Sequence, residues 1–190
     1  MSAGIILMKR YVFVAALAFF LGANLPLVRV LSISNRKNLS EKIYSLEGAR
    51  GGFVISYTHS VNKGRVHDFY RVLPDDSLEL FMTEFVSYGA GISEPYETGG
   101  AVFSSTNDAY VLDNLRRVIP RLVMAVGVVA KHSVSFGKES AENPRFLETN
   151  EFFLENFFAP QTSLIFEVKR ISVLSYVFGR KFKKSEPHGE

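Results

Sequence analysis

Short segments with alternating side chains recur through the middle of this chain, and they constrain its fold more than any other feature. In residues 53–60 the large side chains Phe53, Ile55 and Tyr57 fall on one face, and the residues between them fall on the other. A period of two is the pattern of a half-buried β-strand. Two further strands are predicted, at 66–73 and 78–86. They are separated by the turn signals Asn62-Lys63-Gly64 and Pro74-Asp75-Asp76-Ser77. Such short connections favour an antiparallel meander.

Weaker patterns predict the remaining elements. These are short strands at 102–105 and 109–112, one helical turn at 114–120, a central strand at 122–130 continuing to 136, a short helix at 150–158, and one long or two short strands at 163–178. The composition agrees, because seventeen Phe and eight Tyr suit pleated, half-buried surfaces. The predicted fold class is all-β, an antiparallel β-sandwich or small barrel preceded by one N-terminal transmembrane helix.

The N-terminal helix is predicted from an uncharged run. Lys9-Arg10 precedes residues 11–28, which carry no charged side chain and would extend about 27 Å as a helix, close to the thickness of a hydrocarbon core. A retained membrane anchor in contact with lipid through residues 11–28 is preferred over two alternatives. A cleaved signal peptide would have Leu21 where a small residue is preferred. A buried helix is disfavoured because the run is apolar on every face.

The predicted organisation follows from this anchor. Residues 1–33 form the anchor, 34–52 a linker, 53–178 the β-rich domain and 179–190 a basic, disordered tail. The position of Lys9-Arg10 directly before the apolar run favours a single-pass protein of the cell membrane with its C-terminal domain outside the cytoplasm. The net charge of +3 is modest, and its basic residues cluster at Lys9-Arg10 and in the tail at 180–184 rather than along a folded element. No nucleic-acid partner is therefore expected.

The residues that could carry chemistry form no recognised motif. The chain has no cysteine, which excludes disulfides, thiolate metal sites and a cysteine nucleophile. A metal site from His59, His67 and Glu84 is conceivable on neighbouring strands, but the spacing matches no known signature. Ser60 follows His59, and adjacent strand residues point to opposite faces, so the two cannot pair as nucleophile and base. No catalytic residue, metal or cofactor is therefore predicted.

Two stretches in this region resemble a family of small bacterial and archaeal domains of unknown function. The matching positions are Tyr57, Thr58, His59, Ser60 and Val61, then Glu84, Ser87, Gly89, Ala90 and Gly91, with Lys131-His132 as a later element. The resemblance covers residues 53–134. Members of that family are often encoded beside, or fused to, TRAP transporters of the TAXI type. The resemblance therefore implies an accessory role on the outer side of the membrane, with a TRAP permease or its solute-binding protein as partner.

Under this hypothesis six residues form a ligand or partner surface: His59, Ser60, Glu84, Ser87, Gly89 and Gly91. A structural interpretation of the same residues stays open, since Tyr57 can cap a core, Glu84 can pair with an arginine and the glycines can shape a turn. Two other functions stay open as well: an independent small-molecule or metal-binding module of the cell envelope, and an envelope enzyme.

Overall fold

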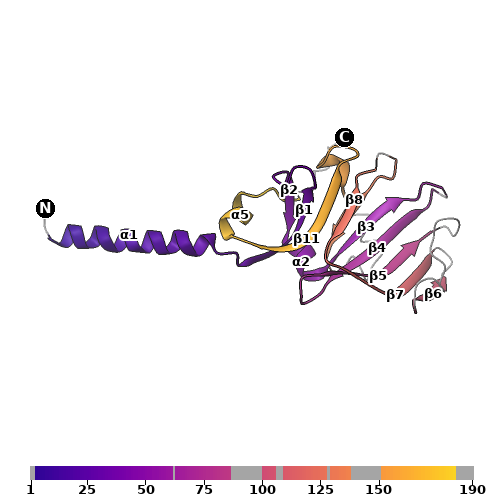
Figure 1. The fold of residues 1–190 in the computed structure, drawn as a ribbon, viewed down its shortest axis with the longest axis horizontal. Coiled ribbons are helices and arrows are strands. Elements are labelled where there is room, and N and C mark those ends of the chain that lie inside the picture. Colours follow the sequence, from indigo (N-terminus) through magenta and orange to yellow (C-terminus); the bar gives the residue numbers. More distant parts are fainter. Residues whose placement is uncertain are drawn as a thin grey trace, which may run out of the picture.

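The computed structural model describes residues 3–61, 63–86, 100–105, 109–127, 129–137 and 151–182, with side chains from Met8 onward. Within these residues one long N-terminal helix, α1 (Ala3–Asn24), precedes eleven strands in two sheets (Figure 1). Every pairing between these strands is antiparallel. The predicted antiparallel all-β fold is therefore confirmed, in a sandwich-like arrangement of two sheets.

The two sheets differ in width. The smaller has the order β2 (Lys42–Ser45), β1 (Val28–Asn35), β11 (Ser163–Ile171) and β8 (Leu122–Ala125). The larger has the order β10 (Phe152–Phe153), β9 (Ser133–Phe136), β3 (Phe53–Thr58), β4 (Arg65–Val72), β5 (Leu78–Phe85), β7 (Tyr110–Ile119) and β6 (Val102–Ser105). We call them the four-stranded and the seven-stranded sheet.

The main core lies between the two sheets. Phe53 on β3 stacks on Tyr70 of β4, with ring centroids 5.0 Å apart, and on Phe166 of β11 at 5.8 Å. Leu31 on β1 and Leu78 on β5 are fully buried in the same cluster. Each sheet therefore contributes its apolar face, and burial of large side chains at about 25 cal/mol per Å² holds the layers together.

The seven-stranded sheet continues past this core. Its strands β5, β7 and β6 lie at the end of the domain opposite α1 (Figure 1). A second buried cluster, formed by Val66, Phe85 and Leu112, lies in this part of the sheet. The inner face of the seven-stranded sheet thus carries two apolar clusters. Polar residues between these clusters can be partly buried although the four-stranded sheet does not cover them.

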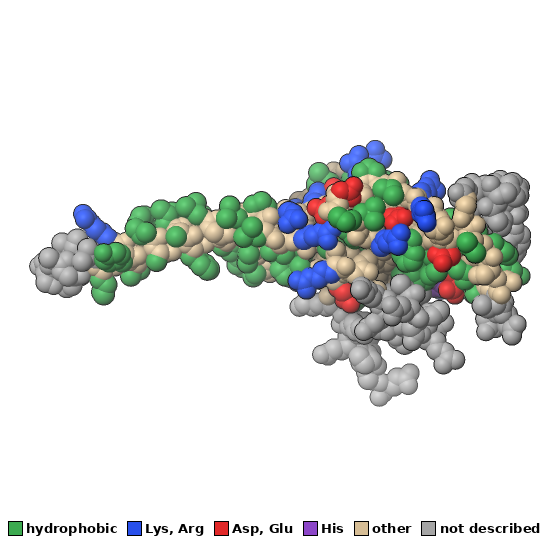
Figure 2. All heavy atoms as spheres, turned by 90° about the horizontal axis from the view of Figure 1, so that it is seen from below, with side chains coloured by type: hydrophobic (Ala, Val, Ile, Leu, Met, Phe, Trp, Pro, Cys, Tyr) green, Lys and Arg blue, Asp and Glu red, His purple; other side chains and the backbone are tan. Residues whose placement is uncertain are grey.

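Helix α1 projects from the domain and exposes apolar side chains around its circumference (Figures 1 and 2). Four consecutive residues, Tyr11 to Val14, each have more than 60% of their area exposed, and consecutive helix residues point about 100° apart. In the part of the chain that the structure describes, no helix combines the length and the apolar character of a membrane span. The predicted transmembrane helix is not found.

The predicted apolar run of residues 11–28 is divided between helix α1, a three-residue link and the first residue of β1. The helix ends at Asn24, whose side-chain amide donates to the carbonyl oxygen of Phe20 at 2.7 Å. Pro26 follows, and a proline biases the residue before it away from the helical region. Strand β1 then begins at Val28 and pairs with β11. Residues 28–33, assigned to the anchor from the sequence, therefore belong to the sandwich.

The predicted linker at 34–52 is also structured, because it contains β2 and the short helix α2 (Leu46–Gly51). The hydroxyl of Ser45 accepts a hydrogen bond from the backbone N–H of Gly48 at 2.9 Å and so caps the start of α2. Gly52 ends the helix at a φ of 87°, where a Cβ atom would collide with the carbonyl oxygen of Tyr70. The polar composition of this segment predicts a linker, but β2 is ordered by its pairing with β1, which is not visible in the local sequence.

Several elements in the second half of the chain differ in type from their predictions. Residues 114–119 belong to β7 rather than to a helical turn, and the central strand predicted at 122–130 is shorter, because β8 ends at Ala125. The segment predicted as a helix at 150–158 contains β10 and the 3₁₀ helix η2 (Leu154–Asn156). The second half of 163–178 is a short helix, α5 (Val173–Phe178). Ser172 caps α5, accepting from the backbone N–H of Ser175 at 3.1 Å. A capping hydroxyl of this kind overrides the strand tendency of a short apolar segment.

The predicted disordered tail is partly ordered. Its first residues lie along β2, where the backbone N–H of Tyr44 donates to the carbonyl oxygen of Arg180 at 3.0 Å. Phe182 then packs against three other phenylalanine rings at centroid distances of 4.8 to 5.1 Å. Residues 180–182 thus extend the sandwich.

Candidate functional site

Of the six residues predicted to form a ligand or partner surface, three lie in the described part of the chain and three lie outside it. His59 and Ser60 lie in the turn after β3, and Glu84 lies on β5. Ser87, Gly89 and Gly91 lie outside the described residues, so their role stays a prediction. The strand register places Glu84 beside His67, which is in turn opposite Ser56. His59 is three residues beyond Ser56, a separation of about 10 Å along the strand.

His59 organises the β3–β4 turn. Its backbone N–H donates to the carbonyl oxygen of Gly64 at 2.9 Å, and its own carbonyl oxygen accepts from Lys63 at 3.1 Å. Its ring nitrogen Nδ1 accepts from the backbone N–H of Val61 at 3.3 Å. These contacts support the structural interpretation of His59, in which the side chain shapes a turn.

A polar row crosses the outer face of the seven-stranded sheet. The hydroxyl of Ser56 lies 2.7 Å from Nδ1 of His67, and the next strand places Glu84 beside the same ring. Burial, and then the charge of Arg65, lower the pKa of His67 to about 4. Burial raises the pKa of Glu84. Because Ser56 has no exposed area, this serine–histidine pair offers no access to a substrate.

Arg65 ties this row to the neighbouring strand. Its guanidinium donates to the hydroxyl of Ser133 at 2.7 Å and to the carboxylate of Glu151 at 2.8 Å. A third hydrogen bond goes to the carbonyl oxygen of Lys131 at 3.0 Å. The side chain of Glu151 is only 11% exposed, so the ion pair is largely shielded from water. Arg65 therefore holds β4, β9 and the segment before β10 together.

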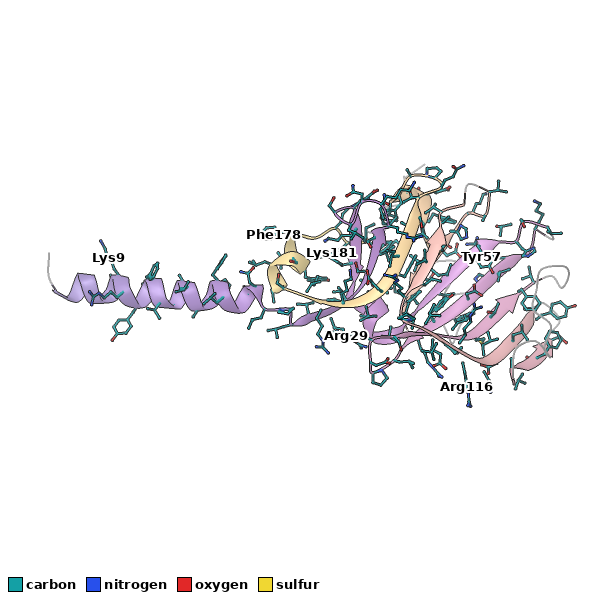
Figure 3. The ribbon with its side chains drawn as sticks, in the orientation of Figure 1. Lys9, Arg29, Tyr57, Arg116, Phe178 and Lys181 are labelled. Atoms are coloured by element: carbon teal, nitrogen blue, oxygen red, sulfur yellow. The ribbon has the colours of Figure 1, made fainter. Side chains whose placement is uncertain are left out.

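A second polar cluster lies on the inner face of the same sheet, centred on Asp68 of β4. The hydroxyl of Thr83 on β5 donates to the Asp68 carboxylate at 2.9 Å. The hydroxyl of Tyr57 on β3 hydrogen-bonds the same carboxyl from the other side. Figure 3 shows Tyr57 on the seven-stranded sheet. Three adjacent strands thus direct one carboxyl and two hydroxyls to a single point.

The surroundings of Asp68 favour its neutral form. Burial raises the pKa of Asp68 to about 6, although the hydrogen bonds from Thr83 and Tyr57 and the charge of Arg117 act in the opposite direction. Burial and the nearby carboxyl also raise the pKa values of Tyr57 and Tyr70. A carboxyl that changes charge near pH 6 within a set of hydroxyls is a typical feature of a ligand site, although structural networks also produce it.

His132 lies next to the inner cluster, beside Tyr57. Its Nδ1 accepts from the backbone N–H of Gly127 at 2.9 Å, and its ring lies 5.6 Å from that of Tyr57. Burial, followed by the charge of Arg65, lowers its pKa. His132 therefore acts here as a neutral acceptor that holds a loop. Among the residues that the structure describes, no group of three His, Asp or Glu side chains is placed to hold a metal ion.

Asp68 was not predicted from the sequence as a site residue, although one signal was present. In the strand 66–73 the residues Val66, Asp68 and Tyr70 share one face, and a carboxyl on the apolar face of a strand is unusual. Thr83 carries no comparable signal, since its role depends on the pairing of β4 with β5.

Together these features define a class: a small antiparallel β-sandwich domain with titratable groups held on both faces of its larger sheet. Residues 53–142 match the model of a family described as Domain of unknown function (DUF1850). The match begins at the first residue of β3, includes β3 to β9, and covers slightly less than half of the chain. No curated protein and no solved structure matched the chain.

This match supports the expectation that the chain contains a domain of an uncharacterised family. It leaves out α1, β1, β2 and β11, so the four-stranded sheet is mostly outside the matched region. The Asp68 cluster and the Ser56–His67 pair both lie within it. The family description gives no information about transport.

Proposed function

We propose that this protein is an accessory domain attached to the cell membrane through α1, with its sandwich outside the cytoplasm, and that it serves a TRAP-type solute transporter. The observation that carries the membrane attachment is the exposed apolar surface of α1. Eight large apolar residues between Tyr11 and Leu21 are 47% to 77% exposed, and no charged residue lies among them. Transfer of these side chains from water to lipid would contribute on the order of 10 kcal/mol.

The transporter link has a separate basis. It rests on the resemblance of residues 57–61 and 84–91 to domains encoded beside TAXI-type transporters. The matched family supports only the domain type. The architecture is compatible with an accessory role, because the polar clusters of the seven-stranded sheet are carried on a folded domain at the end of a helix (Figure 1).

The first test is fractionation of the full-length protein from its native membranes. We expect it to sediment with membranes and to be released by detergent. A variant carrying Phe13→Gln, Leu17→Gln and Phe19→Gln should appear in the soluble fraction, while the matched exposed changes Val61→Gln and Val118→Gln should not alter the distribution. Recovery of the unaltered protein in the soluble fraction would refute membrane attachment.

Sidedness and partner can then be tested with the same material. The chain has no cysteine, so Ser104→Cys on the exposed strand β6 gives a single reporter. We expect a membrane-impermeant maleimide to label it in intact cells. Affinity purification in mild detergent should recover a TRAP permease or its solute-binding protein. Repeated purification without either protein would refute the accessory role.

A second candidate function is an independent small-molecule-binding module. The Asp68 cluster favours it, because a carboxyl and two hydroxyls converge from three strands. Its ligand would be a small polar molecule or cation that donates hydrogen bonds to the carboxylate. Native mass spectrometry of the purified chain should then show a bound species that Asp68→Asn removes. Ser135→Ala, on the other face of the sheet, is the control.

A further inference from the structure

The short helix α5 leaves several apolar side chains exposed on the surface of the domain. None of its six residues is buried, and Val173, Val177 and Phe178 are 40%, 56% and 83% exposed. α5 lies at the end of the domain where α1 joins it (Figure 1), and the two helices are in contact. The link between α1 and β1 adds Leu25 and Leu27, which are also exposed. These residues continue the apolar surface of α1 onto the domain.

Basic side chains surround this apolar surface. The register of β1 with β11 pairs Arg29 with Arg170 and Val30 with Lys169, close to the point where α1 ends. Arg29 forms an ion pair with Asp76 at 2.6 Å and Lys169 forms one with Glu167 at 2.7 Å, so their charges are partly neutralised within the domain. Lys169 and Arg170 are exposed. Lys181 follows α5, and its ammonium donates to the carbonyl oxygen of Val177 at 2.9 Å. Figure 2 shows Lys and Arg side chains gathered on the domain next to α1, and Figure 3 shows Arg29, Phe178 and Lys181 at this end.

A groove of about 580 Å³ opens beside Phe178, between α5 and the start of β2. Lys42 and Arg180 supply positive charge to its lining, and Ser175 supplies a hydroxyl. Glu41 adds one carboxylate. Two cations and a hydroxyl next to an exposed aromatic side chain match the chemistry of a lipid phosphate headgroup at the boundary between water and acyl chains.

We propose that α5 and the α1–β1 link rest on the surface of an anionic lipid bilayer, with Phe178 and Val177 inserted between headgroups. The exposed Arg170 and the groove residues Lys42 and Arg180 then lie against lipid phosphates. This proposal rests on the proposed membrane attachment and names the lipid that the domain contacts. A protein partner is disfavoured, because six residues offer far less area than the roughly 800 Å² per partner of a stable protein interface. Continuity with α1 and the basic surroundings favour lipid.

The chain contains no tryptophan, so a single substitution gives an unambiguous fluorescence reporter. We would reconstitute full-length Phe178→Trp into vesicles of phosphatidylcholine with phosphatidylglycerol, with and without brominated acyl chains. Phe19→Trp in α1 reports on membrane attachment, and Phe103→Trp on β6 reports on the far end of the domain (Figure 1). We expect blue-shifted, bromine-quenched emission from the first two variants and neither effect from the third.

The outcomes separate the two proposals. Quenching of Phe19→Trp without quenching of Phe178→Trp would overturn docking of α5 and leave membrane attachment intact. Absence of quenching in both variants would overturn both. Quenching of Phe178→Trp that is equally strong in pure phosphatidylcholine would overturn the requirement for anionic lipid.

The charge requirement has its own test. In the Phe178→Trp background, Arg170→Gln or Arg180→Gln should each lower the ratio of docked to undocked domain about fivefold in anionic vesicles. The control is Arg116→Gln, whose side chain lies at the lower edge of the seven-stranded sheet, away from α1 and α5 (Figure 3). An equal effect of all three substitutions, or no effect of any, would overturn the role assigned to the basic residues.

Discussion

The two polar clusters of the seven-stranded sheet contribute to stability with opposite dependence on pH. Asp68 on the inner face has its pKa raised to about 6, and His67 on the outer face has its pKa lowered to about 4. The two residues are neighbours on β4 and point to opposite faces. We predict that Asp68→Asn and His67→Asn change the pH dependence of unfolding in opposite directions.

The magnitudes follow from the pKa values. A change of one in pKa corresponds to about 1.4 kcal/mol. The contribution of Asp68, whose ordinary pKa is 3.8, is fully present below that pH and is lost as the pH rises through 6, which amounts to about 3 kcal/mol. The contribution of His67 is fully present above its ordinary pKa of 6.5 and is lost as the pH falls through 4, also about 3 kcal/mol.

These two contributions nearly cancel in the unaltered protein between pH 4 and pH 7. Asp68→Asn removes the first, so the free energy of unfolding should rise by about 3 kcal/mol from pH 4 to pH 7 relative to the unaltered protein. His67→Asn removes the second, so the same quantity should fall by about 3 kcal/mol. Asparagine at position 67 can still hydrogen-bond the hydroxyl of Ser56, so the substitution mainly removes the titratable group.

The assay is chemical unfolding of the full-length protein in a neutral detergent, followed by circular dichroism at half-unit intervals of pH and constant ionic strength. Comparison with the unaltered protein cancels the titrating groups away from the substituted residue, including His132. If Asp68→Asn leaves the pH dependence unchanged, Asp68 titrates normally and the inner cluster is not a perturbed site. If both variants change the pH dependence in the same direction, the opposite pKa shifts of Asp68 and His67 are refuted.

Three further predictions concern single contacts. Gly52→Ala should destabilise the protein by more than 2 kcal/mol in chemical unfolding, because the added Cβ meets backbone, whereas Gly100→Ala, also at positive φ but in open space, should cost about 1 kcal/mol. Phe182→Ala should cost about 2 to 4 kcal/mol in chemical unfolding through lost ring packing. Ser135→Ala should be neutral or stabilising in thermal unfolding, because its buried hydroxyl has no partner among the described residues.

The alternation of side chains was sufficient to predict the centre of the fold. The strands expected at 53–60, 66–73 and 78–86 are β3, β4 and β5, and their antiparallel order follows from short turns. The pleat itself imposes a period of two, so a strand with one buried face reveals itself locally. A helix near the N-terminus is also predicted from local sequence, because a long uncharged apolar run favours a helix. The structure has this helix, α1, but not the predicted membrane span.

Only the tertiary structure decided which segments complete the sandwich. β1 follows directly on the apolar run of α1 and is a strand because β11 pairs with all eight of its residues from the far end of the chain. The short β2 and the residues after α5 are ordered in the same way, by partners distant in sequence. The Asp68 cluster depends on the register of β3, β4 and β5, which brings Tyr57 and Thr83 to one carboxyl. Local sequence determines which face a side chain takes, whereas its partners are determined by pairing between strands.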